Sequence, residues 1–145
     1  MIVADSNTIA YLLIPGEYSE QAKAVFKKDS NWVAPFLWRS EFCNILALYL
    51  RKKLLTLTQA QQLFIKANFL MQGSEYEIDL SKVLNLASVS GCSAYDCEFV
   101  ALAQKLGVLL VTTDRKLLQA FPSETISMDK FIKGPDIDNQ ATDKK

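Results

Sequence analysis

Short apolar runs that do not alternate with polar residues are the feature that most constrains this chain. Residues 108–112 (VLLVT) are β-branched and leucine-rich, which is typical of a strand buried on both faces of a parallel sheet. Strand-like segments also occur at 2–5, 32–37, 76–78 and 125–128. Since strands that alternate with helices build parallel sheets covered on both faces, we expect an α/β fold, a three-layer α/β/α domain with a central, mostly parallel sheet.

Hydrophobic periodicity and capping signals predict where the helices lie. Thr58 and Gln61 have the spacing of a capping box, as do Ser93 and Asp96, and Gly107 stands where the second of these helices should end. The expected helices span residues 6–14, 17–28, 40–53, 58–70, 80–90, 94–106 and 115–121.

A length of 145 residues fits one domain, which we place at residues 1–133, and the polar residues 134–145 are expected to form a disordered tail. No basic leader begins the chain, and no apolar run approaches the roughly 20 residues of a membrane span. The three cysteines, Cys43, Cys92 and Cys97, contain no CxxC pair, so we expect core thiols in a reducing compartment. The sequence predicts a cytoplasmic protein without membrane contact.

Composition excludes several kinds of chemistry. The chain has no histidine, which removes Ser-His-Asp and Cys-His triads, histidine-based ribonucleases and histidine-ligated metals. Its 16 basic and 16 acidic residues cancel, so it is not a general polycation. An enzyme of this composition would rest its chemistry on carboxylates.

Four acids stand where strands end or helices begin. Asp5 and Asp114 each follow a strand, and Glu41 and Asp96 occupy first turns of helices. Ligands of open α/β sheets bind beyond the carboxyl ends of the strands, so we expect these side chains to converge there. Clustered carboxylates repel one another, and a divalent cation relieves the repulsion. Oxygen ligands favour Mg²⁺ or Mn²⁺, ions that commonly serve phosphodiester hydrolysis.

Each acid also has a purely structural explanation. Asp5 and Asp114 suit helix N-caps, Asp96 completes a capping box, and Glu41 complements a helix dipole. The spacing alone leaves both explanations open.

Three stretches of the chain form an ordered series of motifs. They are IVADSNTIAYLL at 2–13, APFLWRSEFCNIL at 34–46, and SAYDCEFVALAQKLGVLLVTTDRKLL at 93–118, of which the last is the most characteristic. Over about residues 1–130 the chain resembles the PIN-domain family, and most closely the VapC-type toxins of toxin–antitoxin pairs. The resemblance implies a PIN fold and a Mg²⁺- or Mn²⁺-dependent endoribonuclease that hydrolyses RNA phosphodiester bonds as a toxin.

The resemblance also assigns residues. The family's catalytic and metal-binding acids fall on Asp5, Glu41, Asp96 and Asp114, the same four that the strand ends select. Where some relatives carry a further acid, this chain has Arg115 and Lys116, so no fifth ligand is expected.

Neighbouring polar side chains are candidates for orienting these carboxylates, although local helix capping explains them equally well. They are Ser6, Asn7, Thr112 and Thr113. Glu98 lies roughly 200° round the helix from Asp96 and is expected on the surface.

Charge is uneven along the chain. Residues 1–73 carry 8 basic and 5 acidic side chains, and residues 74–145 carry 8 and 11. Candidates for contacts with RNA phosphates are Arg39, Arg51, Lys52 and Lys53, and a solvated helix end is the alternative explanation.

Residues 42–50, with Trp38, are more apolar than one buried helix face requires. Core packing explains them, while the resemblance implies a groove for the helix of a cognate antitoxin protein or the face of a homodimer.

Other classes of function stay open at this point. One is a catalytically silent PIN-like binding module, and another is an RNA- or DNA-processing nuclease outside a toxin–antitoxin pair. A receiver-like phosphoacceptor domain is disfavoured, because its only central candidate, Asp79, precedes a helix that it can cap.

Overall fold

The structure is a computed structural model that describes residues 1–134. At its centre is a five-stranded sheet with the strand order β3-β2-β1-β4-β5, in which every neighbouring pair is parallel. This arrangement confirms the expected three-layer α/β/α class. The strands are β1 (Ile2–Ala4), β2 (Trp32–Pro35), β3 (Glu75–Tyr76), β4 (Leu110–Val111) and β5 (Thr125–Ile126).

Helices connect these strands and cover the sheet. Within the described residues they are α1 (Ser6–Leu13), α2 (Ser19–Lys28), α3 (Trp38–Arg51), α4 (Leu57–Met71), α5 (Leu80–Ser90), α6 (Ala94–Leu106), α7 (Arg115–Ala120) and α8 (Met128–Lys133).

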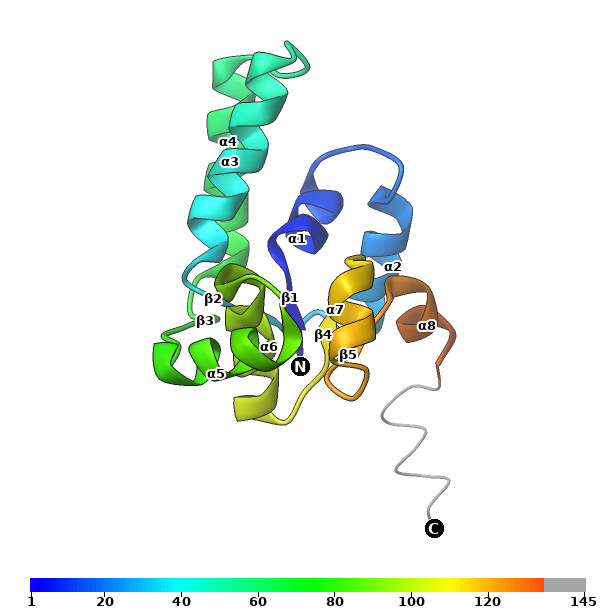
Figure 1. The fold of residues 1–145 in the computed structure, drawn as a ribbon. Coiled ribbons are helices and arrows are strands. Elements are labelled where there is room, and N and C mark those ends of the chain that lie inside the picture. Colours follow the sequence, from blue (N-terminus) through cyan, green and yellow to red (C-terminus); the bar gives the residue numbers. More distant parts are fainter. Residues whose placement is uncertain (135–145) are drawn as a thin grey trace.

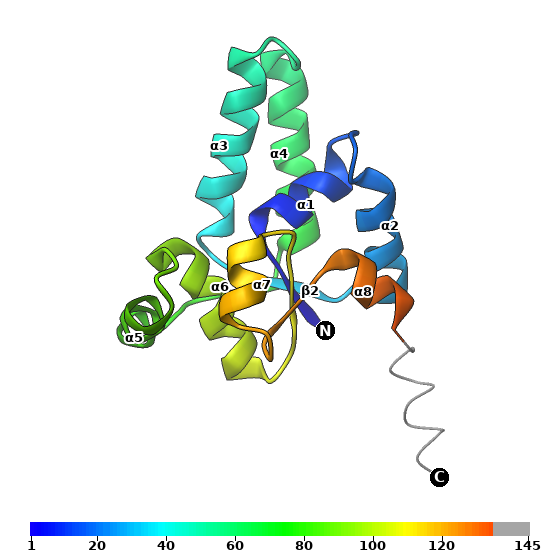
Figure 2. The same cartoon turned by 45° about the vertical axis from the view of Figure 1, so that its right-hand side comes forward.

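Helix α6 lies directly against β1, β2 and β4, and α5 packs on α6. A second group of helices is joined by contacts of α1 with α2, α3 and α4, and of α2 with α8. Helices α3 and α4 form an antiparallel hairpin that extends away from the rest of the molecule (Figures 1 and 2). The base of this hairpin therefore lies near the sheet and its tip lies far from it.

Burial explains why the strands lack alternating polar residues. All three residues of β1 and both residues of β4 are buried, as are all four of β2. The central strands have helices on both faces, so neither side of the pleat meets water. The apolar start of α3 contributes to the same core, where Trp38 and Phe42 pack with Phe64 of α4.

The fourth strand is shorter than its apolar run. We expected pairing over 108–112, but β4 contains two residues. Val108 N–H instead donates to the carbonyl of Ala103 at 3.0 Å, because residue 108 belongs to the turn that ends α6 at Gly107.

The predicted N-cap of the fourth helix was wrong by two residues. Thr56 and Gln59 form the reciprocal capping box of α4, rather than Thr58 and Gln61. The sequence Thr-Leu-Thr-Gln-Ala-Gln contains two overlapping boxes, and the earlier one adds backbone hydrogen bonds to the helix.

Three further expectations need correction. Helix α8, which Ser127 caps, was not predicted, because the residue three positions after Ser127 is neither an acid nor a glutamine. Cys92 and Cys97 are buried as expected, but Cys43 is exposed on the hairpin. Third, Glu98 is half-buried rather than fully on the surface, and its pKa is raised by burial. The tail expected over 134–145 lies, from residue 135 on, outside the described residues.

No helix within residues 1–134 has the length and apolar character needed to cross a membrane.

Substitution of Gly107 tests how the end of α6 is built. Gly107 has φ +65°, a left-handed conformation, although a side chain would meet nothing within 4 Å. We expect Gly107→Ala to lower the free energy of unfolding by about 1–2 kcal/mol, because only the backbone conformation opposes the methyl group. Urea denaturation measures this loss. Gly16→Ala, at a glycine without positive φ and with open space around it, is the control and should change little.

Candidate active site

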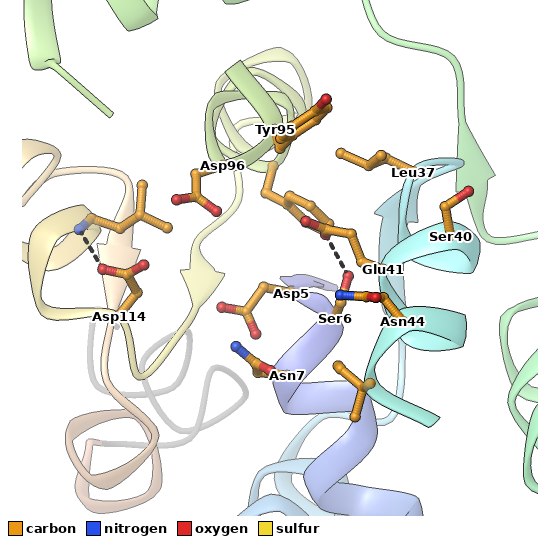
Figure 3. Close-up of a pocket in the computed structure, with 13 residues that line it drawn as sticks. Asp5, Ser6, Asn7, Leu37, Ser40, Glu41, Asn44, Tyr95, Asp96 and Asp114 are labelled. Atoms are coloured by element: carbon orange, nitrogen blue, oxygen red, sulfur yellow. Dashed lines mark hydrogen bonds between the residues drawn. The ribbon is translucent and has the colours of Figure 1, made fainter. Parts of the chain in front are cut away.

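The four acids selected from the strand ends line one pocket. Asp5 directly follows β1 and Asp114 lies three residues after β4, while Glu41 and Asp96 come from the first turns of α3 and α6. The cavity has a volume of about 450 Å³. Figure 3 shows the side chains of Asp5 and Asp96 directed toward the space between these elements. The carboxyl ends of the two central strands therefore open onto a carboxylate-lined pocket.

Asp5 is held by hydrogen bonds that also begin a helix. Its Oδ1 accepts from the backbone N–H of Thr8 at 2.9 Å and from the Thr8 hydroxyl at 2.7 Å, which makes it the N-cap of α1. Its Oδ2 accepts from the Thr112 hydroxyl at 2.5 Å. Burial raises the pKa of Asp5, hydrogen bonds from Thr112 and Thr8 oppose that rise, and repulsion from Asp96 adds to it.

Glu41 is tied to the first helix by Ser6. The buried Ser6 hydroxyl donates to Glu41 Oε1 at 2.7 Å, so α1 and the start of α3 meet at this contact (Figure 3). Burial is the main cause that raises the pKa of Glu41. The hydrogen bond from Ser6 opposes the rise, and the charges of Asp96 and Asp5 add to it.

Asp96 lies in the first turn of α6. The Ser93 hydroxyl caps this helix by accepting from the backbone N–H of Asp96 at 3.0 Å. Burial raises the pKa of Asp96, and repulsion from Asp114 raises it further, against smaller lowering contributions from Ser93 and Lys116. The Ser93 hydroxyl, which caps the backbone N–H of Asp96, thus fixes the position of Asp96 in the pocket.

Asp114 and Asp5 are connected through Thr112. Thr112 is fully buried, and its Oγ1 accepts from the backbone N–H of Asp114 at 3.0 Å while it donates to Asp5. Asp114 Oδ1 in turn caps α7 by accepting from the N–H groups of Lys116 and Leu117. The structural explanation by capping therefore holds for Asp5 and Asp114, and it coexists with their place in the pocket.

The pocket has an uncompensated negative charge. Its lining includes four carboxylates and neither lysine nor arginine. Lys116 is the nearby cation that affects Asp96, and its Nζ donates to the carbonyl of Gly91 at 2.7 Å. Repulsion and burial together favour either proton uptake or a bound cation.

The chemistry of the donors fits a hard divalent cation. Carboxylate oxygens without histidine or thiolate are the ligands that Mg²⁺ and Mn²⁺ prefer. Among residues 1–134, however, no three histidine, cysteine, aspartate or glutamate side chains lie close enough together to hold a metal ion. Asp5 and Asp114 each use an oxygen in a helix cap. Binding of an ion therefore requires these side chains to move closer together.

The remaining candidates are distributed unevenly. Ser6 and Asn7 line the pocket. Thr112 does not line it but donates a hydrogen bond to Asp5, and half-buried Thr113 is not part of the lining either.

The basic candidates lie outside the pocket. Arg39 forms a two-bond ion pair with Glu75, at 2.6 and 2.7 Å. Arg51, Lys52 and Lys53 stand at the end of α3, about 15 Å along the helix axis from Glu41.

Three polar residues of the lining were not foreseen. Tyr95, 64% exposed, lies beside Asp96, and Ser40 and Asn44 come from the start of α3 (Figure 3). Helical spacing is the signal that could have found Asn44, which follows Glu41 by three residues and so shares its face.

With fold and site described, comparison with known proteins places the chain in a family. The model of the PIN domain family matches residues 2–121, and the chain belongs to this family.

Individual relatives agree with that placement. The chain is 33% identical to Ribonuclease VapC3 of Pyrobaculum aerophilum over 128 residues, which cover 84% of this chain and 95% of the relative. Its fold matches the crystal structure of PAE2754 from Pyrobaculum aerophilum with a TM-score of 0.73 at 21% identity, over 90% of this chain and 85% of the other. It also matches FitAcB from Neisseria gonorrhoeae with a TM-score of 0.67 at 19% identity, over 88% and 98%.

Substitution of Asp96 tests how far the burial and repulsion of its carboxylate destabilise the folded protein. The folded pKa of Asp96 exceeds its unfolded value, so its stabilising contribution is complete below the unfolded pKa and is lost as pH rises through the folded pKa. We therefore expect Asp96→Asn to be more stable than the parent at pH 7, because it removes both the burial of a charge and the repulsion from Asp114, with a melting temperature higher by about 2–4 °C per kcal/mol relieved. Thermal melts from pH 3 to 8 in EDTA measure the difference, which should vanish toward pH 3.

The control for this effect is Asp129→Asn, which removes an exposed carboxylate from α8, outside the pocket. A gain of equal size in this control would contradict the explanation that burial and repulsion raise the pKa of Asp96. A gain for Asp96→Asn that does not depend on pH would contradict it as well.

Thr112→Val tests the connection between Asp5 and Asp114. Valine keeps the shape but removes the hydroxyl, so we expect a loss of about 1–3 kcal/mol in unfolding free energy. The pKa of Asp5 should rise further without this donor, so the loss should be larger at pH 7 than at pH 4. Denaturant titrations at the two pH values provide the measurement. Thr112→Ser keeps the hydroxyl, and its smaller loss should not depend on pH.

Proposed function

We propose that this chain is a metal-dependent endoribonuclease that hydrolyses phosphodiester bonds of RNA and acts in the cytoplasm as the toxin of a VapBC-type toxin–antitoxin pair. The carrying observation is that four carboxylates, three of them with raised pKa values, line one pocket whose lining contains no lysine or arginine. Membership of the PIN domain family and the similarity to Ribonuclease VapC3 support the reaction class.

In this proposal Asp5, Asp96 and Asp114 hold a Mg²⁺ or Mn²⁺ ion, and Glu41 completes the site. Such an ion activates water and neutralises charge on the phosphate and on the leaving oxygen. The repulsion among the carboxylates supports this assignment, because no lysine or arginine in the pocket lining offsets it.

The protein's own side chains then position the acids. Ser6 orients Glu41, and Thr8 and Thr112 fix the two oxygens of Asp5. Each of these hydrogen bonds favours the charged form of its carboxylate and so opposes the rise in pKa that burial causes. Asn7 and Tyr95, both exposed, stand at the pocket where the RNA would enter.

Phosphate contacts are proposed for Arg51, Lys52 and Lys53 rather than for Arg39. The guanidinium of Arg39 already pairs with Glu75 and stacks near Phe36, so a phosphate would have to compete for it. The three basic residues at the tip of the α3–α4 hairpin are about 15 Å from Glu41, which suits phosphates several nucleotides away from the cleaved bond.

A cognate antitoxin and a second copy of the chain are the proposed protein partners. Apolar side chains are exposed along the α3–α4 hairpin, among them Leu57, Ile65 and Phe69, and an apolar groove lies between the two helices. Exposed apolar surface of this kind supports contact with another protein.

Expression of paired variants tests the nuclease. Wild type and Asp129→Asn should arrest growth and produce discrete new RNA 5′ ends, whereas Asp5→Asn and Asp96→Asn should lose cleavage by more than about 100-fold while staying folded. Asp129 is the control because it is an exposed carboxylate on α8 that does not line the acidic pocket. Growth curves and sequencing of RNA 5′ ends are the measurements.

The purified protein distinguishes the alternatives. Cleavage that disappears in EDTA and returns with Mg²⁺ or Mn²⁺ supports metal dependence. Full activity of both Asn variants would refute the site. Soluble wild type with no cleavage and no metal binding would indicate the silent binding module, and metal-dependent cleavage without growth arrest would favour a processing nuclease.

A further inference from the structure

A second pocket adjoins the acidic one and is lined by tyrosines. It has a volume of about 330 Å³ and lies between α1, the start of α2 and α3. Asn7 and Ile45 line both pockets, so the two are adjacent. Tyr11, Tyr18 and Tyr49 provide its aromatic walls, and none of them belongs to the acidic pocket.

Two of these rings pack against each other, and one of the two is partly exposed. The ring centroids of Tyr11 and Tyr18 are 4.8 Å apart at an interplanar angle of 41°, and Tyr18 is 38% exposed. Within the described part of the chain the hydroxyls of these two tyrosines and of Tyr49 make no hydrogen bond. The pocket thus offers an aromatic surface and unused hydroxyl groups.

The loop that carries Tyr18 is fixed in place. The Ser19 hydroxyl accepts from the N–H of Gly16 at 2.7 Å and donates to the carbonyl of Ile14 at 3.0 Å. The N–H of Ser19 donates back to the carbonyl of Gly16 at 3.2 Å. Because the turn is closed by its own hydrogen bonds, the aromatic surface is preorganised before a ligand arrives.

The charge of the pocket favours a nucleobase over a phosphate. Its lining contains no lysine or arginine and one carboxylate, that of Glu17. A carboxylate repels phosphate but accepts hydrogen bonds from the exocyclic amine of a base. Every base also has a flat face that stacks on aromatic rings.

The distance suits a nucleotide next to the cleaved bond. The six residues from Asp5 to Tyr11 rise about 9 Å along α1. A nucleic acid strand covers that length in about three nucleotides when its bases are stacked about 3.4 Å apart, and in fewer when extended.

We propose that this tyrosine pocket is a nucleobase subsite for the RNA substrate. The base of a nucleotide within about three positions of the cleaved phosphate stacks on the exposed face of the Tyr11–Tyr18 pair, with its polar edge toward Glu17. This subsite rests on the proposed ribonuclease function and gives that enzyme a preference for a base beside the cut.

Fluorescence of a labelled RNA tests the subsite without turnover. The probes are single-stranded 12-nucleotide RNAs with 2-aminopurine at successive positions, added to the full chain carrying Asp96→Asn. We expect quenching at one or two adjacent positions. Adding Tyr11→Leu or Tyr18→Leu should remove the quenching and weaken binding by about 5- to 100-fold. Tyr18→Phe should keep the quenching, because it keeps the ring.

Phe36→Leu is the matched control, since Phe36 is an exposed ring just before α3 that lines neither pocket. It should leave both quenching and affinity unchanged. Near-identical circular dichroism and melting temperatures of the variants separate lost stacking from lost folding.

Unchanged RNA affinity and quenching in both tyrosine variants would overturn the subsite, and the pocket would then be available to a protein partner instead. This result is distinguishable from failure of the proposed function. If the wild type cleaves RNA with the same base preference as Tyr18→Leu, the subsite is wrong and the nuclease stands. If the wild type cleaves nothing but quenching depends on the tyrosines, the base pocket stands and the nuclease fails.

Discussion

Burial of neighbouring, mutually repelling carboxylates at the end of a parallel sheet is the constraint on which the rest of this structure depends. Asp5, Glu41 and Asp96 all have raised pKa values, with burial as the first cause and neighbouring acids as a further one. The fold holds them together through donors: Thr8 and Thr112 to Asp5, and Ser6 to Glu41. These contacts connect β1, α1, α3 and the residues after β4, so the groups that orient the acids also join the central elements of the domain.

Capping and pocket formation are two consequences of one arrangement. A helix that starts right after a parallel strand needs a side-chain acceptor for its first N–H groups, and an aspartate there directs its other oxygen toward the sheet end. Asp5 follows this pattern with one oxygen on Thr8 and the other on Thr112. A structural role for Asp5 and Asp114 therefore does not argue against a chemical one, because the cap is what places each carboxylate at the pocket.

The parts of the fold that sequence could predict are those with strong local signals. The buried run at 108–112, the Asp79 cap and Gly107 at the end of α6 indicated their elements because burial, capping and positive φ each restrict residue type. Local pattern failed where it was degenerate, as at the overlapping boxes of Thr56 and Thr58, or where long-range contacts decide the outcome. Pairing of Arg39 with Glu75, 36 residues away, is such a contact.

The same reasoning explains why the acids could be selected from sequence and the tyrosine pocket could not. Strand ends are marked in the chain, and a parallel topology then brings them to one edge of the sheet whatever the loops do. Tyr11, Tyr18 and Tyr49 come from three helical segments whose faces meet only after α1 packs against both α2 and α3. The two pockets differ in charge. Four carboxylates line the acidic pocket, so a phosphate would need a cation to bind there, while the tyrosine pocket has a single carboxylate and aromatic faces. A nucleic acid strand has both phosphates and bases within a few nucleotides, so two adjacent pockets of opposite preference would suit the RNA substrate proposed for this chain.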